Sequence, residues 1–338
     1  MRSVPAAYNK YDSVMFTDDL FVPPKSKLEH LSEYFFGASE SAASNGTTQH
    51  KLGQGSNSLN LRNPDGTMWV GPMIMGGVKE LEVVYDTGSD WLVIESATCS
   101  NCEGDKYDPA TSSGNAEKKS YTLSERNYGS ASLEGYEFYD KVCISLNTCI
   151  DDFEFFLIES QRGISEPIDG ILGLSRNNAF HIAPDQGNRS GPLYIENLYK
   201  AGKINANKFS FYFNQPSDFS WMDMGEPDTS LFKPDAEVVR TQMIDPDFFW
   251  GFMNTGIAIG SISNAFVYGE YEDLPREVFY DNALYSIIDT GSTALVISVL
   301  YYEALINELF KSSGVTKWTY TQGAVFTPCE SKLQPLFF

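Results

Sequence analysis

One nonapeptide occurs twice in this chain, and the repetition limits what the chain can fold into. The first copy is Asp86-Thr87-Gly88-Ser89-Asp90-Trp91-Leu92-Val93-Ile94, and the second is Asp289-Thr290-Gly291-Ser292-Thr293-Ala294-Leu295-Val296-Ile297. The copies differ only at their fifth and sixth positions. Apolar residues precede and end each copy, so each is predicted to be a polar loop between two strands. Two such half-sites indicate two similar lobes that each contribute one carboxylate to a common site.

The Asp that begins each copy is the predicted catalytic group. Gly88 and Gly291 permit a tight turn and let another chain approach closely. If Asp86 and Asp289 face each other within hydrogen-bonding distance, they cannot both ionise cheaply and are predicted to share one proton. Such a pair can activate a water molecule for attack on a carbonyl carbon. This chemistry needs no metal ion and no cofactor, and none is predicted.

The hydroxyl side chains of the same loops are predicted to support the carboxyl groups. Thr87 and Thr290 can hydrogen-bond to the opposite loop and join the two copies. Ser89 and Ser292 can each donate to the outer oxygen of the neighbouring Asp. A single Asp-Thr-Gly is a common turn tripeptide. Two copies in the same strand–loop–strand setting favour a catalytic site over a structural turn.

The length and charge of the chain limit the class of protein. The 338 residues are 42% hydrophobic and 14% aromatic, which is typical of a globular chain long enough for two domains. The formal net charge is -21, which disfavours nucleic acid and anionic membranes as partners because both would be repelled. Residues 248–269 carry no charge, but their Gly, Asn and Ser content predicts strands and turns instead of a membrane span.

Four of the five cysteines form two close pairs, and the fifth is Cys329. Cys99 and Cys102 are separated by two residues, whereas Cys143 and Cys149 lie on either side of a predicted turn between two strands. Two local disulfides in an oxidising compartment are the preferred interpretation. The alternative is a zinc site formed by all four thiolates, which is disfavoured because the second spacing is wide for a zinc knuckle.

Short β-rich segments separated by turns dominate from Met68 onward and predict an all-β protein. Two helices are predicted from start and stop signals, over residues 192–201 and 298–310. The clearest predicted strands cover residues 81–85, 153–158 and 209–213.

The composition also suggests a division into domains. Residues 1–60 contain Ser-, Gly- and Asn-rich stretches and are interpreted as a partly flexible N-terminal extension, with one short helix over 27–36. An N-terminal lobe over 61–228 would carry the first Asp loop. A partial C-terminal lobe over 229–338 would carry the second.

Together these residues resemble the pepsin-like family of eukaryotic aspartic proteases, from about Gly66 to Phe338. The resemblance implies a bilobal double β-barrel with a cleft between the lobes and with Asp86 and Asp289 as the catalytic pair. Met68-Trp69-Val70-Gly71-Pro72 is similar to the first strand of that family.

Two further segments carry the resemblance. Tyr128-Gly129-Ser130-Ala131-Ser132 is similar to the flap, the hairpin that closes over substrate, with Tyr128 as the flap tyrosine and with Gly129 and Ser130 offering backbone contacts to the peptide. Trp91 is interpreted either as a support for that tyrosine or as a core residue. Asp169-Gly170-Ile171-Leu172-Gly173-Leu174 is similar to the segment that supports the first Asp loop from behind. Cys99 and Cys102 occupy the place of a small disulfide of the family.

The sequence departs from the family pattern towards both of its ends. No second Ile-Leu-Gly segment follows Asp289, and Cys329 resembles the first cysteine of a disulfide whose partner would lie further along. The second lobe is therefore expected to be truncated. The preferred explanation is an incomplete gene product; the alternatives are a segment supplied by another chain or a degenerate, inactive relative. Residues 1–50 are not basic, unlike the prosegments of the family, which argues against zymogen behaviour.

The resemblance implies an acid-active endopeptidase that acts as a monomer on an extended peptide or protein substrate. It also implies a secreted, lysosomal or vacuole-like location, although residues 1–20 lack the apolar segment of a signal peptide. The alternative is a catalytically impaired relative that binds peptides without cleaving them.

Overall fold

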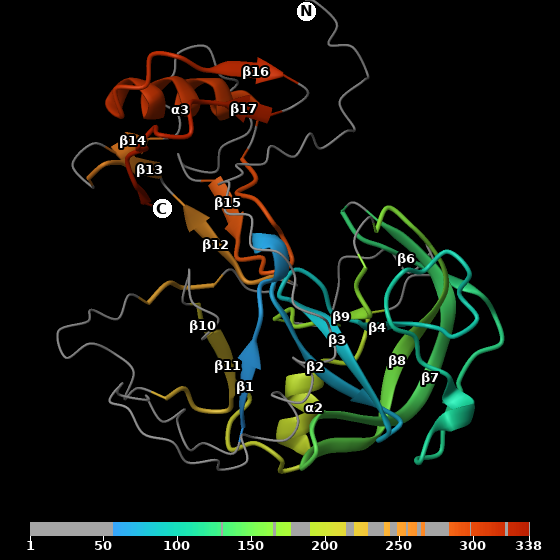
Figure 1. Ribbon diagram of the computed structural model, residues 1–338. Helices are drawn as coiled ribbons and strands as arrows, with labels where there is room; N and C mark the ends of the chain where they lie inside the picture. Colours follow the sequence, from blue (N-terminus) through green and yellow to red (C-terminus); the bar gives the residue numbers. More distant parts are fainter. Residues whose placement is uncertain are drawn as a thin grey trace, which may run out of the picture. The chain divides into compact units, whose positions relative to one another are not determined.

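The structure is a computed structural model that describes residues 57–129, 131–164, 167–176, 190–213, 220–228, 240–243, 249–254, 256–261, 265–267, 284–297, 299–321 and 324–337 (Figure 1). The chain divides into two compact units. The larger unit contains Pro23–Trp250 and Ile287–Gly291, and the smaller contains Gly251–Ser286 and Ser292–Phe338. The helix predicted over 27–36 lies outside the described residues. The lobe boundary predicted after Asp228 stays a prediction.

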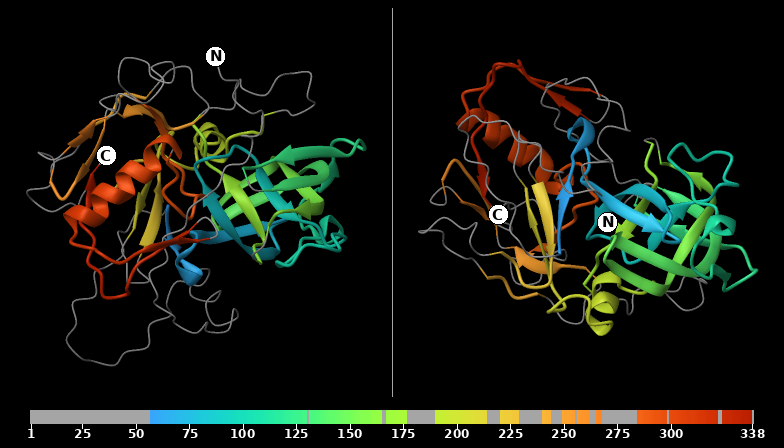
Figure 2. Two further views of the ribbon diagram at one scale, coloured as in Figure 1. Left: turned by 90° about the horizontal axis from the view of Figure 1, so that it is seen from above. Right: turned by 60° about the horizontal axis from the view of Figure 1, so that its bottom comes forward.

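Six of the described strands in the larger unit form a closed β-barrel, which Figure 2 shows from two further directions. Their order is β2-β3-β9-β4-β8-β7, and β2 also pairs with β7, which closes the ring. The prediction of an all-β protein is confirmed. The strands are β2 (Val70–Met75), β3 (Lys79–Asp86), β4 (Leu92–Glu95), β7 (Ser132–Ser145), β8 (Thr148–Arg162) and β9 (Gly170–Gly173).

The barrel forms because its central strands contain apolar runs, such as residues 83–85 and 92–94, that are buried. Every residue of β4 is buried, since β9 and β8 pair with its two edges and apolar side chains cover its faces. Tyr85 is fully buried, and its hydroxyl donates to the carbonyl of Pro72 at 2.9 Å. The central core includes Leu61, Met73, Leu81, Val83, Tyr85, Leu92, Ile94, Phe155, Leu172 and Met222.

The larger unit has additional elements outside the ring. β5 (Glu117–Lys118) and β6 (Ser124–Asn127) pair with β7, and β1 (Ser58–Leu61), β11 (Ser220–Met224) and β10 (Phe209–Tyr212) form a second sheet. Residues 58–60 therefore belong to a strand, whereas the predicted domain division assigned them to the N-terminal extension. Two 3-10 turns cover Pro64–Gly66 and Pro109–Thr111.

The first predicted helix is confirmed as α2 (Tyr194–Lys200). It begins later than expected because Leu193 has an extended backbone, with ψ at 120°. It stops where the sequence indicates, since Gly202 adopts a φ of 66°, which favours glycine.

The smaller unit contains short sheets and one helix. β12 (Gly251–Asn254) pairs with β15 (Leu284–Ile287), and β13 (Gly256–Ile259) pairs with β14 (Ala265–Val267) and β18 (Leu336–Phe337). A third sheet joins β16 (Thr319–Thr321) and β17 (Ala324–Phe326).

The second predicted helix is confirmed as α3 (Val299–Ser312), although its expected cap, Ser298, lies outside the described residues. Leu305 and Leu309 of α3 pack in one cluster with Ile257 and Ile259 of β13. Much of the uncharged stretch 248–269 forms strands, as predicted. Within the described parts of the chain, neither helix has the length and apolarity needed to traverse a membrane.

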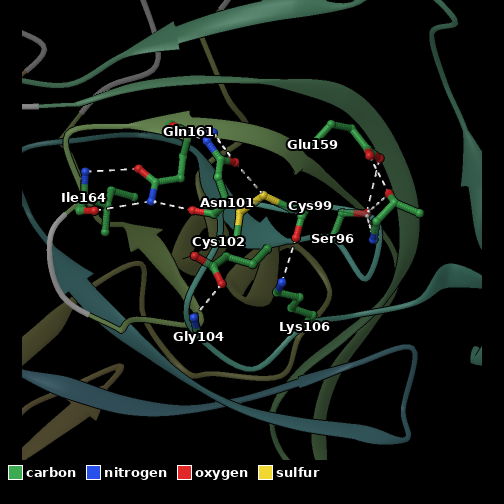
Figure 3. Close-up of a disulfide and its surroundings, with 11 residues drawn as sticks. Ser96, Cys99, Asn101, Cys102, Gly104, Lys106, Glu159, Gln161 and Ile164 are labelled. Atoms are coloured by element: carbon green, nitrogen blue, oxygen red, sulfur yellow. Dashed lines mark hydrogen bonds between the residues drawn. A yellow bond between two sulfur atoms is a disulfide. The ribbon is translucent and has the colours of Figure 1, made fainter.

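The structure contains both predicted disulfides, Cys99–Cys102 and Cys143–Cys149. The zinc alternative is therefore wrong, because all four sulfur atoms are bonded in pairs. Figure 3 shows the first disulfide, whose loop is attached to β8: the Asn101 amide nitrogen donates to the Gln161 carbonyl at 2.7 Å, and the Gln161 amide nitrogen donates to the Asn101 carbonyl at 3.1 Å. Cys329 is free and exposed.

A buried carboxyl beside this loop predicts that the fold is more stable at acid pH. Glu95 is 1% exposed and accepts the Gly104 N–H at 2.8 Å. Burial, and then the charge of Asp169, raise its pKa to about 7. An unfolded Glu titrates near 4.5, so the stabilisation is complete below that pH and is lost as the pH rises through about 7. Urea unfolding at pH 5 and pH 8 should show this loss, on the order of 2 kcal/mol from this group. Glu95→Gln should reduce this loss of stability between pH 5 and pH 8. An unchanged pH dependence in that variant would show that Glu95 is not its source.

Candidate active site

The first Asp loop begins where β3 ends. Asp86 is buried, and its two carboxyl oxygens have separate donors: the Gly88 N–H reaches Oδ1 at 2.8 Å, and the Ser89 hydroxyl donates to Oδ2. The loop then enters β4 at Leu92. This geometry points the Asp86 carboxyl away from the barrel core and fixes both of its oxygens.

β9 supports this loop from behind. It lies between β3 and β4, parallel to the first and antiparallel to the second. The Leu174 N–H donates to the Asp86 carbonyl at 2.7 Å, and the Gly173 N–H donates to the Trp91 carbonyl at 2.9 Å. Asp169 is also buried, and its carboxylate accepts the N–H groups of Glu82 and Asp105, both at 2.7 Å. Asp169 thus holds the backbone before Asp86, and β9 holds the backbone at and after Asp86.

The second Asp loop lies against the first within the larger unit. The Thr87 N–H donates to Thr290 Oγ1 at 3.0 Å, and the Thr290 N–H donates to Thr87 Oγ1 at 2.9 Å. The two hydroxyls donate onward, from Thr87 to the Ile288 carbonyl at 2.8 Å and from Thr290 to the Tyr85 carbonyl at 2.5 Å. These four bonds join the two copies of the repeat through symmetry-related atoms.

The two loops approach so closely that side chains would not fit at their glycines. A Cβ atom at Gly88 would lie 2.7 Å from the Asp289 Cγ atom, and one at Gly291 would collide with the Asp86 carboxyl. Neither Gly88 nor Gly291 has a positive φ, so the requirement for glycine is one of space rather than of backbone conformation.

The Asp289 carboxyl influences the ionisation of Asp86. Burial raises the pKa of Asp86 to about 7, and the Asp289 carboxyl contributes to this rise through its charge and a hydrogen bond. The hydrogen bonds from Ser89 and Gly88 oppose this shift because they favour the charged form. Asp289 accepts the Gly291 N–H at 2.9 Å, which matches the Gly88 bond to Asp86.

The second copy differs from the first in two respects. The Ser292 hydroxyl donates to the Ala294 carbonyl at 3.1 Å, so its proton is not directed at a carboxyl as the sequence predicts. The strand expected after the loop is also wrong: residues 292–297 form a bend and irregular backbone, and Leu295 and Val296 are 43% and 60% exposed. A strand needs partners, and in the described part of the chain no segment pairs with these residues as β8 and β9 pair with β4.

The predicted flap is the hairpin between β6 and β7. Asn127 pairs with Ser132, and the Tyr128 N–H donates to the Ala131 carbonyl at 2.7 Å. Gly129 has open space around it, and Ser130 lies outside the described residues. Burial raises the pKa of Tyr128 well above its usual value, and the charges of Asp86 and Asp90 contribute to this rise, while a hydrogen bond with Ser89 lowers it. The tyrosine hydroxyl therefore lies beside the first Asp loop.

Trp91 belongs to a cluster next to the flap, which we call the Trp91 cluster: Trp91, Val93, Cys99, Cys102, Leu133, Phe156 and Ile158. Tyr128 packs against this cluster, and Trp91 itself is buried. Trp91 is thus a core residue, and the cluster to which it belongs is also a support for Tyr128.

Three residues near the site were not singled out from the sequence. Asp90 is buried and accepts the Gly191 N–H at 2.6 Å, and Arg126 is buried in the flap strand β6. Trp250 connects the supports of both loops, since its Nε1 donates to the Leu174 carbonyl at 2.8 Å and its carbonyl accepts the Ile288 N–H at 3.1 Å. No local pattern in the sequence signalled Arg126, which lies in the polar run Ser124-Glu125-Arg126-Asn127.

Comparison with known proteins matches most of the chain to one family model. The family model "eukaryotic aspartyl protease" matches residues 69–338. Gastricsin of Cavia porcellus is 26% identical over 267 residues, which cover 75% of this chain and 58% of gastricsin. Rhizopuspepsin-1 of Rhizopus niveus is 27% identical over 269 residues, 78% of this chain and 61% of the relative. Cathepsin D of Chionodraco hamatus is 33% identical over 191 residues, 53% of this chain and 44% of the relative. The chain thus spans between 44% and 61% of these three relatives.

Proposed function

Because the chain belongs to the eukaryotic aspartyl protease family, we propose that it is an aspartic endopeptidase with Asp86 and Asp289 as its catalytic pair. The observation that carries this proposal is the joining of the two Asp loops by the reciprocal bonds of Thr87 and Thr290. These bonds hold the loops of Asp86 and Asp289 against each other, which supports a shared role for their carboxyl groups.

The mechanism requires one proton on the pair. Two neighbouring carboxyls cannot both ionise cheaply, which is the established behaviour of aspartic proteases. The ionised member accepts a proton from a water molecule as that water attacks the peptide carbonyl carbon. The protonated member donates its proton to the developing oxyanion. The raised pKa of Asp86 supports this division of roles because it keeps a proton on the pair at acid pH.

The substrate is proposed to be an extended peptide or protein segment that lies beneath the hairpin of β6 and β7. Extended peptides present N–H and C=O groups that strand edges and hairpin tips can pair with. Tyr128, in the turn of this hairpin, lies beside Ser89, and the adjacent Gly129 is exposed. The two disulfides support an oxidising compartment, in accord with the expected secreted, lysosomal or vacuole-like location. A monomer is proposed.

A hydrolysis assay tests the proposal. The full chain is incubated with a mixture of peptides at about pH 3–5, where a carboxyl pair holds one proton, and the products are sequenced by mass spectrometry. We expect internal cleavage that is blocked by a peptide in which a hydroxyl-bearing statine replaces the scissile amide. Absence of cleavage together with binding of the same peptides would favour the impaired relative. The irregular backbone at residues 292–297 is the observation that motivates that second candidate.

The hydrogen bond from Ser89 predicts a shift of the pH profile. Activity should fall as the pH rises through the pKa of the pair, because the shared proton is lost. Ser89 lowers the pKa of Asp86, so Ser89→Ala should move this alkaline limb of kcat/KM to higher pH. Ser292→Ala is the matched control and should leave the limb where it is, since the Ser292 hydroxyl donates to Ala294. Equal shifts in both variants, or none in Ser89→Ala, would contradict the assignment.

A further inference from the structure

Arg126 is a cation buried in the hairpin that is proposed to cover the substrate. It lies on β6, two residues before Tyr128, opposite Leu133 of β7, and it is 4% exposed. Leu133 and the rings of Trp91 and Phe156 make its surroundings apolar, so a guanidinium at this position is unusual. Burying an ion without compensation is expensive, and an apolar side chain of similar volume would often stabilise a fold as well or better.

The guanidinium stacks on the Trp91 cluster. The Arg126 Cζ atom lies 4.6 Å from the centroid of the Trp91 ring and 4.7 Å from that of the Phe156 ring. The two rings meet edge to face, with centroids 6.3 Å apart. A planar guanidinium is suited to such contacts, which are stronger where water is excluded.

Carboxylates and a carbonyl compensate its charge. Nη2 donates to Glu137 Oε1 at 2.7 Å, and Nη1 donates to the Glu125 carbonyl at 2.8 Å. Burial raises the pKa of Asp90 to about 6, and the Gly191 N–H and the charge of Arg126 oppose this rise. Glu125 and Glu137 belong to the hairpin strands β6 and β7, whereas Asp90 belongs to the first Asp loop.

These contacts connect the hairpin to the loop that carries Asp86. Trp91 and Asp90 directly follow Ser89, whose hydroxyl donates to Asp86. β9 donates a hydrogen bond to the Trp91 carbonyl, and the Gly191 N–H donates to the Asp90 carboxyl. Trp91 and Asp90, with which Arg126 interacts, are therefore held in place. Tyr128, which directly follows β6, interacts with Ser89.

We propose that Arg126 is a positioning residue that fastens the β6–β7 hairpin to the first Asp loop and thereby holds Tyr128 beside Ser89. This role rests on the proposed function, because it concerns how the hairpin closes over a peptide. Arg126 acts through Trp91, Asp90 and Glu137, and it does not touch the reacting atoms.

Hydrogen–deuterium exchange of the full chain tests the proposal without requiring activity. In Arg126→Met, amide exchange over residues 124–135 should accelerate roughly tenfold or more, while exchange in β3 and β9 stays as in wild type. Arg126→Lys keeps a counter-charge for Glu137 but loses the planar stack, so it should fold and also show faster hairpin exchange. Lys119→Met is the matched control: it removes another cation near Glu137, at 3.9 Å, and should leave hairpin exchange unchanged.

Kinetics provide a second readout where wild type cleaves peptides. Both Arg126 variants should raise KM more than they lower kcat, because the hairpin is less often closed. The proposal is overturned if hairpin exchange in both variants equals wild type, or if exchange rises equally throughout the barrel. Faster hairpin exchange in a chain that cleaves no peptide would reject the proposed function and retain the role of Arg126.

Discussion

Replacing either carboxyl of the pair by an amide is expected to abolish peptide hydrolysis. Asp86→Asn and Asp289→Asn should each lower kcat/KM by about 10³-fold or more, because each variant removes one of the two proton transfers. The double variant should be little worse than either single variant, since the two groups act as a unit. Initial rates of cleavage of one peptide at about pH 4 provide the measurement.

Both amide variants should remain folded. In Asp86→Asn the side-chain amide keeps an oxygen that can accept from Gly88 or Ser89, and the substitution removes the unfavourable approach of two carboxyls. The unfolding temperature of Asp86→Asn should therefore be no lower than that of wild type. Asp151→Asn is the control, because that side chain is 84% exposed on the barrel surface. Wild-type activity in either active-site variant would reject the proposed pair.

The second large effect is expected from adding one methyl group behind the first loop. In Gly170→Ala the new Cβ would collide with the Val93 carbonyl oxygen and lie 2.9 Å from Ile94 Cδ1. Gly170 belongs to β9, which is paired on both sides and cannot move aside without breaking the barrel. We expect a loss of about 3 kcal/mol or more in the free energy of unfolding, seen by urea titration, and a fall in activity because β9 holds the Asp86 backbone.

Gly129→Ala is the matched control for this substitution. No atom lies within 4 Å of the position that its Cβ would take, so the free energy of unfolding should change by less than about 0.5 kcal/mol. Equal stability of the two variants would show that β9 adapts to a side chain, and the proposed support of the Asp86 loop would then be wrong.

The sequence predicted the features that depend on local patterns. The first copy of the nonapeptide forms the predicted strand–loop–strand unit, from β3 to β4, because its apolar residues and its glycine determine local structure. Gly202 and Pro192 marked the ends of α2 to within two residues because capping is also local. The two disulfides were predicted from spacing and from the turn between Cys143 and Cys149, and both are present.

Several features that depend on packing between distant segments were not predicted. The burial of Arg126 follows from the meeting of β6 with Trp91, and no local pattern in the sequence encodes that meeting. Leu295 and Val296 repeat Leu92 and Val93 in sequence. Only Leu92 and Val93 form a strand, because β8 and β9 pair with them. Ser89 and Ser292 likewise occupy equivalent positions and donate to different acceptors.

A crystal structure of the full chain with a statine-containing peptide examines most directly whether the two aspartates serve one reacting group. The statine hydroxyl should occupy the position of the attacking water, within about 2.6–3.2 Å of a carboxyl oxygen from Asp86 and of one from Asp289. A hydroxyl that contacts only one of them, or a peptide bound away from both, would contradict this arrangement.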